Sequence, residues 1–361
     1  MKILYLLESI GTGGVEDIIT RLSICLQATY HDQITILIFS DIDSANKRKL
    51  EAAGITVVIS PFHKRYNLLN ILFYAYYINK YRFQIVHANH VFPQLILAFA
   101  SLLIRPDVCV ITTEHSVWNK KRKWKIMRCL DHFIYGRYQA VVSVSRAVED
   151  ALLKWLKKEH SDKFSVIYNG IDLERFSQAL PYSREELSLC EQDIVLCSVG
   201  RMVYGKDFAT ILYALTQLPD QYKAIFIGDG PMLNENRKLA QSLNLSSRVR
   251  FLGNKSNVEQ YLKMSDIYIA SSFFEGFGVT VLEAMASGCP VIATEIAAFS
   301  EILQEKNQLF PIQDVNALVN RIQHINSSVV QNNLKRITDF STENMVLNYH
   351  RLYEKCLKNK N

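Results

Sequence analysis

Residues Ser271–Thr294 read SSFFEGFGVTVLEAMASGCPVIAT, and this stretch decides the fold class. The apolar, β-branched run Ile267–Ala270 just before it predicts a buried strand. Two glycines then predict a tight turn, and Val279–Ala286 predicts a short helix that ends before Gly288. Val291–Thr294 predicts the next strand. Strand, glycine turn, helix and strand form the repeating unit of a parallel α/β sheet, and similar alternation runs through the whole chain.

The start of this predicted helix is suited to a phosphate, because its unpaired N–H groups and its dipole favour an anion. Glu275 and Glu283 flank it. Carboxylates repel phosphate but accept hydrogen bonds from sugar hydroxyls, so the pattern favours a sugar nucleotide. An ordinary strand–helix turn with one exposed and one capping glutamate is the alternative, since a glycine motif alone is weakly specific.

The full string, with seven residues between Glu275 and Glu283, resembles the signature of the family-4 (group 1) retaining glycosyltransferases of GT-B fold. This resemblance implies that Glu275 contacts the donor sugar as a catalytic residue and that Glu283 holds the ribose hydroxyls. It also implies that the backbone after Glu275 binds the donor diphosphate, at Phe277, Gly278, Val279 and Thr280.

A second donor-binding pair is expected at Arg201 and Lys206, which follow the predicted strand Asp193–Val199. Arginine can grip a diphosphate as a bidentate fork and lysine as a point charge. The spacing resembles that of the donor-phosphate pair of the same family. The alternative is that Arg201 and Lys206 are two ordinary surface cations. No cluster of metal ligands accompanies the pair, so we expect transfer without a metal or other cofactor.

The first half also opens as a doubly wound α/β domain, with a strand, a glycine loop and a helix. The resemblance implies that Gly13 and Gly14 in this loop lie across a cleft from the Glu275 turn, near the donor phosphate. His115 follows a predicted strand, where open α/β sheets place ligands, and the resemblance implies that it faces the donor sugar as a catalytic residue. His87 and His90 are the competing candidates.

The chain has 361 residues, which is long enough for two domains. Its residues are 49% apolar and 21% charged, as in a typical globular protein. We expect residues 1–175 to form an acceptor-side Rossmann-like domain, with a C-terminal helix at 341–357 packing back on it. Residues 176–340 are expected to form a nucleotide-sugar-binding domain. The longest apolar run, Val91–Ile104, is too short to span a bilayer. The seven cysteines are scattered and no secretory signal is evident, so we expect a cytoplasmic protein.

The basic excess lies entirely in the first half, where residues 1–180 hold 23 Lys and Arg against 16 Asp and Glu. Its densest part combines cations with tryptophans, a mixture typical of membrane interfaces. A solvated face is the alternative, and nucleic acid is disfavoured because no motif for it is present. We therefore expect an anionic membrane or acceptor surface, at Trp118, Lys120, Lys121, Arg122, Lys123 and Trp124.

Together these features predict two doubly wound Rossmann-like domains facing a cleft. They predict a retaining hexosyltransferase that moves a sugar from a UDP- or GDP-linked donor to a lipid-linked or glycan acceptor. The expected setting is bacterial surface polysaccharide biosynthesis at the inner face of the cell membrane. Two alternatives stay open: a nucleotide-sugar epimerase or hydrolase of the same fold, and a non-catalytic subunit that binds nucleotide or membrane.

Overall fold

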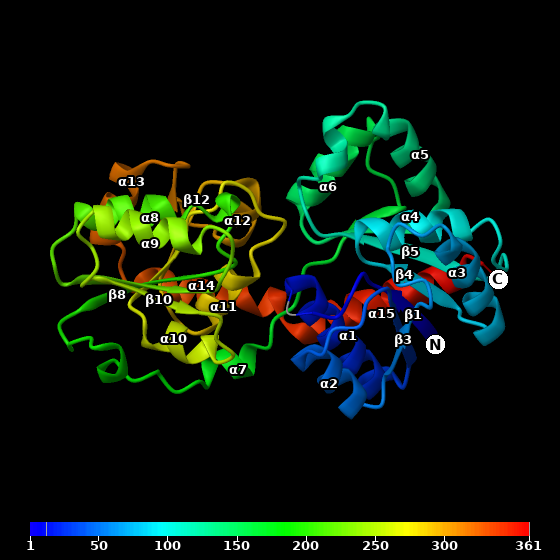
Figure 1. The fold of residues 1–361 in the computed structure, drawn as a ribbon, viewed down its shortest axis with the longest axis horizontal. Coiled ribbons are helices and arrows are strands. Elements are labelled where there is room, and N and C mark those ends of the chain that lie inside the picture. The colour runs from blue at the N-terminus through cyan, green and yellow to red at the C-terminus, as the bar shows by residue number, and fades with distance from the viewer. Residues whose placement is uncertain (12, 361) are drawn as a thin grey trace. The chain divides into compact units, whose positions relative to one another are not determined.

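The computed structural model describes residues 1–11 and 13–360, apart from the side chains of Lys120 and Lys121. The chain forms two compact units, called unit 1 and unit 2 here (Figure 1). Unit 1 comprises Met1–Gly170 and the C-terminal segment from Thr342, and unit 2 comprises Ile171–Ser341. Each is built on a parallel sheet, which confirms the predicted class of two doubly wound α/β domains. The division falls after Gly170, whereas the boundary predicted after residue 175 lies inside the short helix α7.

Unit 1 contains a seven-stranded sheet in the order β3-β2-β1-β4-β5-β6-β7, with every neighbouring pair parallel. Its central strands are buried on both faces, which explains why they read as continuous apolar runs. The strands are β1 (Lys2–Leu6), β2 (Gln33–Ile38), β3 (Thr56–Ile59), β4 (Ile85–Ala88), β5 (Cys109–Glu114), β6 (Ala140–Ser143) and β7 (Phe164–Val166).

Helices cover both faces of this sheet, and α4 and α15 lie on opposite sides of it (Figure 1). One face carries α3 to α6, whose apolar side chains form the larger core of unit 1. On the other face α15 packs against α1. The helices are α1 (Gly14–Tyr30), α2 (Ala45–Ala52), α3 (Leu69–Tyr81), α4 (Val91–Ala100), η1 (Lys120–Lys123), α5 (Met127–Arg137), α6 (Arg146–Leu156) and α15 (Thr342–Lys358).

Unit 2 repeats the plan with a six-stranded parallel sheet in the order β10-β9-β8-β11-β12-β13. Helices α8, α9 and α13 bury one face, and α10 and α11 lie on the other (Figure 1). The strands are β8 (Ile194–Val199), β9 (Tyr222–Ile227), β10 (Val249–Gly253), β11 (Ile267–Ala270), β12 (Val291–Thr294) and β13 (Leu309–Phe310).

The helical segments of unit 2 include both long helices and single turns. They are α7 (Leu173–Ser177), η2 (Glu185–Leu187), η3 (Tyr204–Lys206), α8 (Phe208–Thr216), α9 (Leu233–Ser242), α10 (Val258–Met264), α11 (Val279–Ala286), α12 (Ala297–Ile302), η4 (Lys306–Gln308), α13 (Val315–His324), α14 (Ser328–Arg336) and η5 (Ile337–Phe340).

A buried polar chain fixes the C-terminal helix α15 to the sheet of unit 1. The hydroxyl of Tyr353 lies 2.8 Å from the hydroxyl of Tyr5 and 2.8 Å from Nδ1 of His87. Nε2 of His87 lies 2.8 Å from Oγ1 of Thr113, which in turn lies 3.3 Å from the hydroxyl of Tyr349. These side chains are all buried, so each bond satisfies a group that water cannot reach.

One predicted strand has different bounds in the structure. The sequence VIYNGID at Val166–Asp172 predicts a strand that runs into an Asn-Gly turn, but β7 covers Phe164–Val166 and the chain then leaves the sheet. Gly170 is held instead by side chains: its carbonyl accepts from Arg21 at 2.7 Å and its N–H donates to the sulfur of Met345 at 3.1 Å. Tertiary contacts therefore override the apolar pattern here.

The first prediction concerns the buried polar chain. Replacing Tyr353 by Phe leaves the Tyr5 hydroxyl and Nδ1 of His87 without their partner, and should lower the free energy of unfolding of unit 1 by about 1–3 kcal/mol. Urea unfolding followed by tryptophan fluorescence measures this, because all three tryptophans lie in unit 1. Tyr76→Phe, at a tyrosine that is 56% exposed, is the matched control. An equal unfolding midpoint for both variants would contradict the account.

Candidate functional site

The predicted donor residues lie where the winding of unit 2 reverses. In this sheet β8 and β11 are neighbours, and the chain after β8 continues toward β9 while the chain after β11 continues toward β12. Open α/β sheets bind ligands beyond the carboxyl ends of such strands. Arg201 and Lys206 follow β8, and Glu275 follows β11, so the sheet brings these two loops together.

Lys206 and Glu275 are in direct contact. The Lys206 ammonium is ion-paired and hydrogen-bonded to Oε1 of Glu275. The same oxygen accepts a hydrogen bond from the hydroxyl of Ser272 at 2.9 Å. Both members of the pair remain partly accessible, with 24% of the Lys206 side chain and 17% of the Glu275 side chain exposed. The site therefore presents a cation and a carboxylate side by side to an incoming ligand.

Further hydrogen bonds join the same two loops. The hydroxyl of Ser271 donates to the carbonyls of Lys206, at 3.1 Å, and Asp207, at 2.8 Å. The N–H of Phe273 donates to the carbonyl of Gly205 at 2.9 Å. Because these bonds use the backbone, they fix the position of Lys206 relative to Glu275 without depending on either charged group.

Gly278 shapes the start of α11. It has φ of 106° and ψ of 50°, in the region where only glycine is at ease, and a Cβ there would lie 2.7 Å from Cε1 of Phe299. The helix begins at the next residue with no side-chain cap on Gly278. Backbone N–H groups at Val279 and Thr280 thus form the first turn, as the predicted phosphate site requires.

Glu283 lies on α11 and shares a neighbour with Glu275. Burial raises the pKa of Tyr268, and the carboxylates of Glu283 and Glu275 both raise it further. The Tyr268 hydroxyl lies 2.8 Å from Oγ1 of Thr280, where it anchors the first turn of α11. Both predicted carboxylates are therefore close to one buried tyrosine. Phe277, by contrast, is buried and packs edge-on against Phe340, so only its backbone can serve a ligand.

Arg201 is exposed at the end of β8, on a loop held by an unusually close backbone contact. A Cβ on Gly228 would lie 2.0 Å from the carbonyl oxygen of Gly200, and Gly228 has φ of 130°. Only glycine permits this approach. The contact fixes the residue before Arg201, while the guanidinium itself stays accessible.

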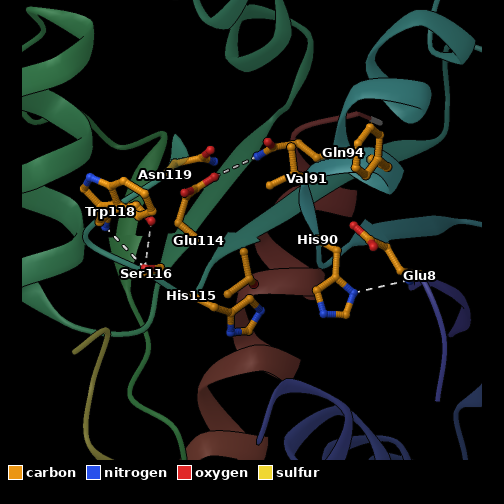
Figure 2. Close-up of a pocket in the computed structure, with 11 residues that line it drawn as sticks. Glu8, His90, Val91, Gln94, Glu114, His115, Ser116, Trp118 and Asn119 are labelled. Atoms are coloured by element: carbon orange, nitrogen blue, oxygen red, sulfur yellow. Dashed lines mark hydrogen bonds between the residues drawn. The ribbon is translucent and has the colours of Figure 1, made fainter. Parts of the chain in front are cut away.

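Unit 1 holds a cavity of about 560 Å³ at its own point of reversal, beyond the carboxyl ends of β1, β4 and β5 (Figure 2). Glu8 and His90 lie at one side of it and Trp118 and Asn119 at the other (Figure 2). His115 lies on its wall, so the predicted catalytic histidine does face a pocket. The cavity is large enough for a sugar ring.

His115 is held as a neutral base. Its Nε2 lies 3.1 Å from Oδ1 of Asn89, and an amide oxygen only accepts, so Nε2 carries the proton. Burial lowers the pKa of His115 to about 3, and the neighbouring His90 and His87 lower it as well. Nδ1 is consequently an acceptor at neutral pH. Burial also lowers the pKa of His90, partly offset by Glu16 and Glu8, and its Nδ1 accepts from the Glu8 N–H at 3.3 Å.

His87, a competing candidate, belongs to the buried polar chain and not to the cavity wall. It is fully buried, both its ring nitrogens are bonded to Tyr353 and Thr113, and burial lowers its pKa to about 3. It does not line the cavity among the described residues. Of the two, only His115 can meet a ligand there.

The basic run divides between the surface and the interior. Lys123 and Trp124 are exposed, and Trp118 is 44% exposed. The side chains of Lys120 and Lys121 lie outside the described structure. Arg122 departs from the prediction: only 9% of its side chain is exposed, and it pairs with the buried carboxylate of Glu114 at 3.0 Å. Burying that carboxylate requires a partner, which explains why Arg122 turns inward.

Gly13 and Gly14 stand at the start of α1, with Gly13 as the residue before the first turn. Glu16 folds back over it, since a Cβ on Gly13 would lie 2.1 Å from Oε2 of Glu16. Together with Asp17, Glu16 places two carboxylates in the first turn. A donor phosphate would share this helix end with both, and its assignment to Gly13 and Gly14 stays a prediction.

Sequence reasoning missed several residues that shape the sites, chiefly Glu8, Gln94 and Glu114 on the cavity wall and Ser272 beside Glu275. Glu8 and Glu114 follow or end predicted strands, so the same edge-of-sheet rule that selected His115 could have found them. Within the described residues, no group of three or more His, Cys, Asp or Glu could hold a metal ion. Nor does any described helix have the length and hydropathy needed to cross a membrane.

Comparison with solved structures defines the class. The chain superimposes on HepE from Anabaena, solved in complex with UDP and glucose, with a TM-score of 0.85. The match covers 98% of this chain and 100% of HepE, at 21% identity. At that identity the likeness shows the fold, which is GT-B, the fold of a large class of glycosyltransferases.

The family follows from two sequence models. Residues 12–175 match the model described as Glycosyltransferase Family 4, and residues 182–354 match the model described as Glycosyl transferases group 1. Together they span most of both units. The chain belongs to the group 1 (family 4) glycosyltransferases, which confirms the resemblance seen in the Glu275–Glu283 motif.

Curated relatives are enzymes of the same kind. The N-acetyl-alpha-D-glucosaminyl L-malate synthase of Bacillus anthracis is 26% identical over 76% of this chain and 75% of its own length. The UDP-Gal:alpha-D-GlcNAc-diphosphoundecaprenol alpha-1,3-galactosyltransferase of Escherichia coli is 26% identical over 71% of this chain and 69% of its own length. This protein is therefore a glycosyltransferase enzyme, and the non-catalytic alternative is set aside.

The second prediction uses the buried neutral histidine. Unfolded His87 binds a proton below about pH 6.5, whereas folded His87 stays neutral down to about pH 3, so the stability of unit 1 should fall as the pH falls. His87→Gln keeps hydrogen-bonding groups but cannot titrate. Between about pH 7.5 and about pH 5.5, wild type should lose about 1.4 kcal/mol more than this variant in urea unfolding. Equal losses would show that folded His87 protonates.

Proposed function

We propose that the protein is a retaining glycosyltransferase that moves a sugar from a nucleoside diphosphate donor bound by unit 2 to an acceptor bound by unit 1. The observation that carries the proposal is the Lys206–Glu275 pair beside the first turn of α11. It combines, on one edge of one sheet, the groups that a diphosphate and a sugar each need.

In this proposal the donor diphosphate lies against the N–H groups of the first turn of α11, with Arg201 and Lys206 as its cations. Developing negative charge on the leaving diphosphate is then offset by fixed positive groups, an effect of about 3–4 kcal/mol for a single well-placed donor. Glu283 accepts from the ribose hydroxyls and Glu275 from the hydroxyls of the sugar. No metal or other cofactor is invoked.

The acceptor is proposed to occupy the cavity of unit 1, with its hydroxyl toward the donor sugar. The bond from the acceptor oxygen to the anomeric carbon forms on the face from which the diphosphate departs, and a departing phosphate oxygen takes the hydroxyl proton. The anomeric configuration is thereby retained. Neutral His115, with Nδ1 as an acceptor, suits a role in orienting sugar hydroxyls better than one as a proton donor.

A UDP-linked donor and a lipid diphosphate-linked acceptor are the first substrates to test. HepE binds UDP, and the relative from Escherichia coli carries both UDP-Gal and a diphosphoundecaprenol acceptor in its name. We infer the same substrate classes for this chain, in the cytoplasm at the inner face of a bacterial membrane, for synthesis of surface glycans. GDP-linked donors form the second arm of the test.

The third prediction tests transfer. Glu275→Gln can still accept from Ser272 and Lys206 but lacks the charge, so transfer should fall by about 100-fold or more while nucleoside diphosphate binding changes little. Glu191→Gln, at an exposed glutamate of unit 2, is the control. Transfer is measured from UDP- and GDP-sugars to a short-chain lipid diphosphate sugar, and calorimetry measures binding.

Three results would contradict the proposal. Normal transfer by Glu275→Gln would remove the role of that carboxylate. An inverted anomeric centre in the product, read by NMR, would reject retention. Rapid donor conversion that no acceptor accelerates would favour the epimerase or hydrolase alternative.

We also propose that unit 1 binds an anionic membrane surface through Trp118, Lys120, Lys121, Lys123 and Trp124. Support comes from the exposure of Trp124, at 70%, and of the neighbouring Ile126, at 74%, beside exposed Lys123. Isolated large apolar side chains flanked by lysines are typical of membrane interfaces. Arg122 is left out of this surface because it is buried against Glu114.

The fourth prediction tests this surface. Replacing Lys120, Lys121 and Lys123 by Ser should weaken binding to anionic vesicles by about 100-fold, since each lysine near such a surface contributes about 1 kcal/mol. Replacing three exposed lysines of unit 2, Lys238, Lys255 and Lys306, is the control and should change little. Cosedimentation at low salt measures both. Wild-type protein that ignores anionic vesicles would refute the membrane surface while leaving the transfer proposal intact.

A further inference from the structure

A second pocket of unit 1, with a volume of about 350 Å³, lies between the loop that follows β5 and the helices α5 and α6. It shares Trp118 and Asn119 with the larger cavity, whereas His90, His115 and Glu114 line only the latter. Four of its lining residues are cations and none of the described ones is a carboxylate. The cations are Arg122, Lys123, Arg128 and Lys154.

Arg122 has hydrogen-bonding capacity that the protein does not use. Its Nη2 donates to Glu114 at 3.0 Å and to the Tyr135 hydroxyl at 3.4 Å. Its Nε and Nη1 atoms are buried and have no hydrogen-bond partner among the described residues. Unsatisfied buried donors are costly and rare, and Arg122 also lines the pocket, so its guanidinium lies next to a space in which an anion could bind.

Two of the other three cations lie over aromatic rings. The Lys123 ammonium lies 5.6 Å from the ring centre of Trp118, and the Arg128 guanidinium lies 5.9 Å from that of Trp155. The indole N–H of Trp155 donates to Oδ2 of Asp131 at 2.8 Å, which fixes the ring. The pocket thus combines two partly buried arginines, Arg122 and Arg128, with two exposed lysines, Lys123 and Lys154.

We propose that this pocket binds the phosphate group of a phosphate ester. An arginine fork and several ammonium groups match the charge and the oxygens of phosphate better than those of a single carboxylate. The pocket has room for the ester group as well as the phosphate. The ester is either the headgroup of an anionic lipid or a soluble sugar or glycerol phosphate. The inference does not depend on the transfer reaction, and the pocket shares only Trp118 and Lys123 with the proposed membrane surface.

Titration of the full chain with sodium phosphate at constant ionic strength tests the site. Tryptophan fluorescence reports on it, because two of the three tryptophans line the pocket and none lies in unit 2. Wild type should show a saturable change that sodium chloride does not produce. The double variant Arg128→Gln, Lys154→Gln should weaken binding by at least about tenfold, the scale expected for losing charged hydrogen bonds. Arg122 is left unchanged, because its removal would leave the buried Glu114 carboxylate without its cation.

Lys158→Gln is the matched control, since Lys158 is exposed just after α6 and does not line the pocket. It should bind phosphate as wild type does. The absence of a saturable change in wild type would overturn the proposal. So would equal affinities in wild type and the double variant, or an equal loss in the control.

Two further arms separate the sources of the phosphate once the site is confirmed. In one, sn-glycerol 3-phosphate replaces inorganic phosphate. In the other, vesicles of phosphatidylcholine with phosphatidic acid compete with bound glycerol phosphate. Displacement by the vesicles identifies a lipid headgroup, and its absence identifies a soluble ester. Lys120, Lys121 and Trp124 are unchanged in every variant here, so the result is distinguishable from failure of the membrane surface.

Discussion

The reversal of winding in each sheet is the constraint on which both candidate sites depend. Parallel strands need helical crossovers, and a sheet buried on both faces must change direction once so that helices cover each face. In unit 1 the change falls between β1 and β4, and in unit 2 between β8 and β11. Loops that leave neighbouring strands toward opposite faces cannot cover the strand ends. Lys206 meets Glu275 at one such point, and Glu8 meets His90 at the other.

Under the proposed function, the contact between Lys206 and Glu275 would be exchanged when the donor binds. Without a ligand the two charges neutralise each other, and backbone hydrogen bonds from Ser271 and Phe273 hold the loops in register. A diphosphate that attracts Lys206 leaves Glu275 with the Ser272 hydroxyl and a free lone pair for a sugar hydroxyl. Phosphate and sugar recognition would then be coupled through one ammonium group. A nucleotide that lacks the sugar would still attract Lys206, but it would offer no sugar hydroxyl to the Glu275 carboxylate.

Sequence alone predicted the parts of this protein that local pattern controls. The apolar runs of the central strands and the glycine at the start of α11 follow from burial and from backbone geometry, so β8, β11 and α11 lie within a residue of their predicted bounds. Contacts between residues far apart in the chain could not be predicted from the sequence alone. The choice between His87 and His115 needed the position of Tyr353, which lies more than two hundred residues away.

Arg122 shows why a run of charges cannot be interpreted by counting. In a 3-10 helix such as η1, which has three residues per turn, neighbouring side chains point in different directions, so Arg122 faces the interior while Lys123 faces solvent. Glu114 ends a central strand and is buried, and a buried carboxylate without a partner would destabilise the unit strongly. Arg122 therefore stabilises the interior, and the same side chain also lines the second pocket. The basic excess of the first half thus divides into an interior ion pair, a pocket wall and an exposed surface. The net charge of the first half does not distinguish these three environments.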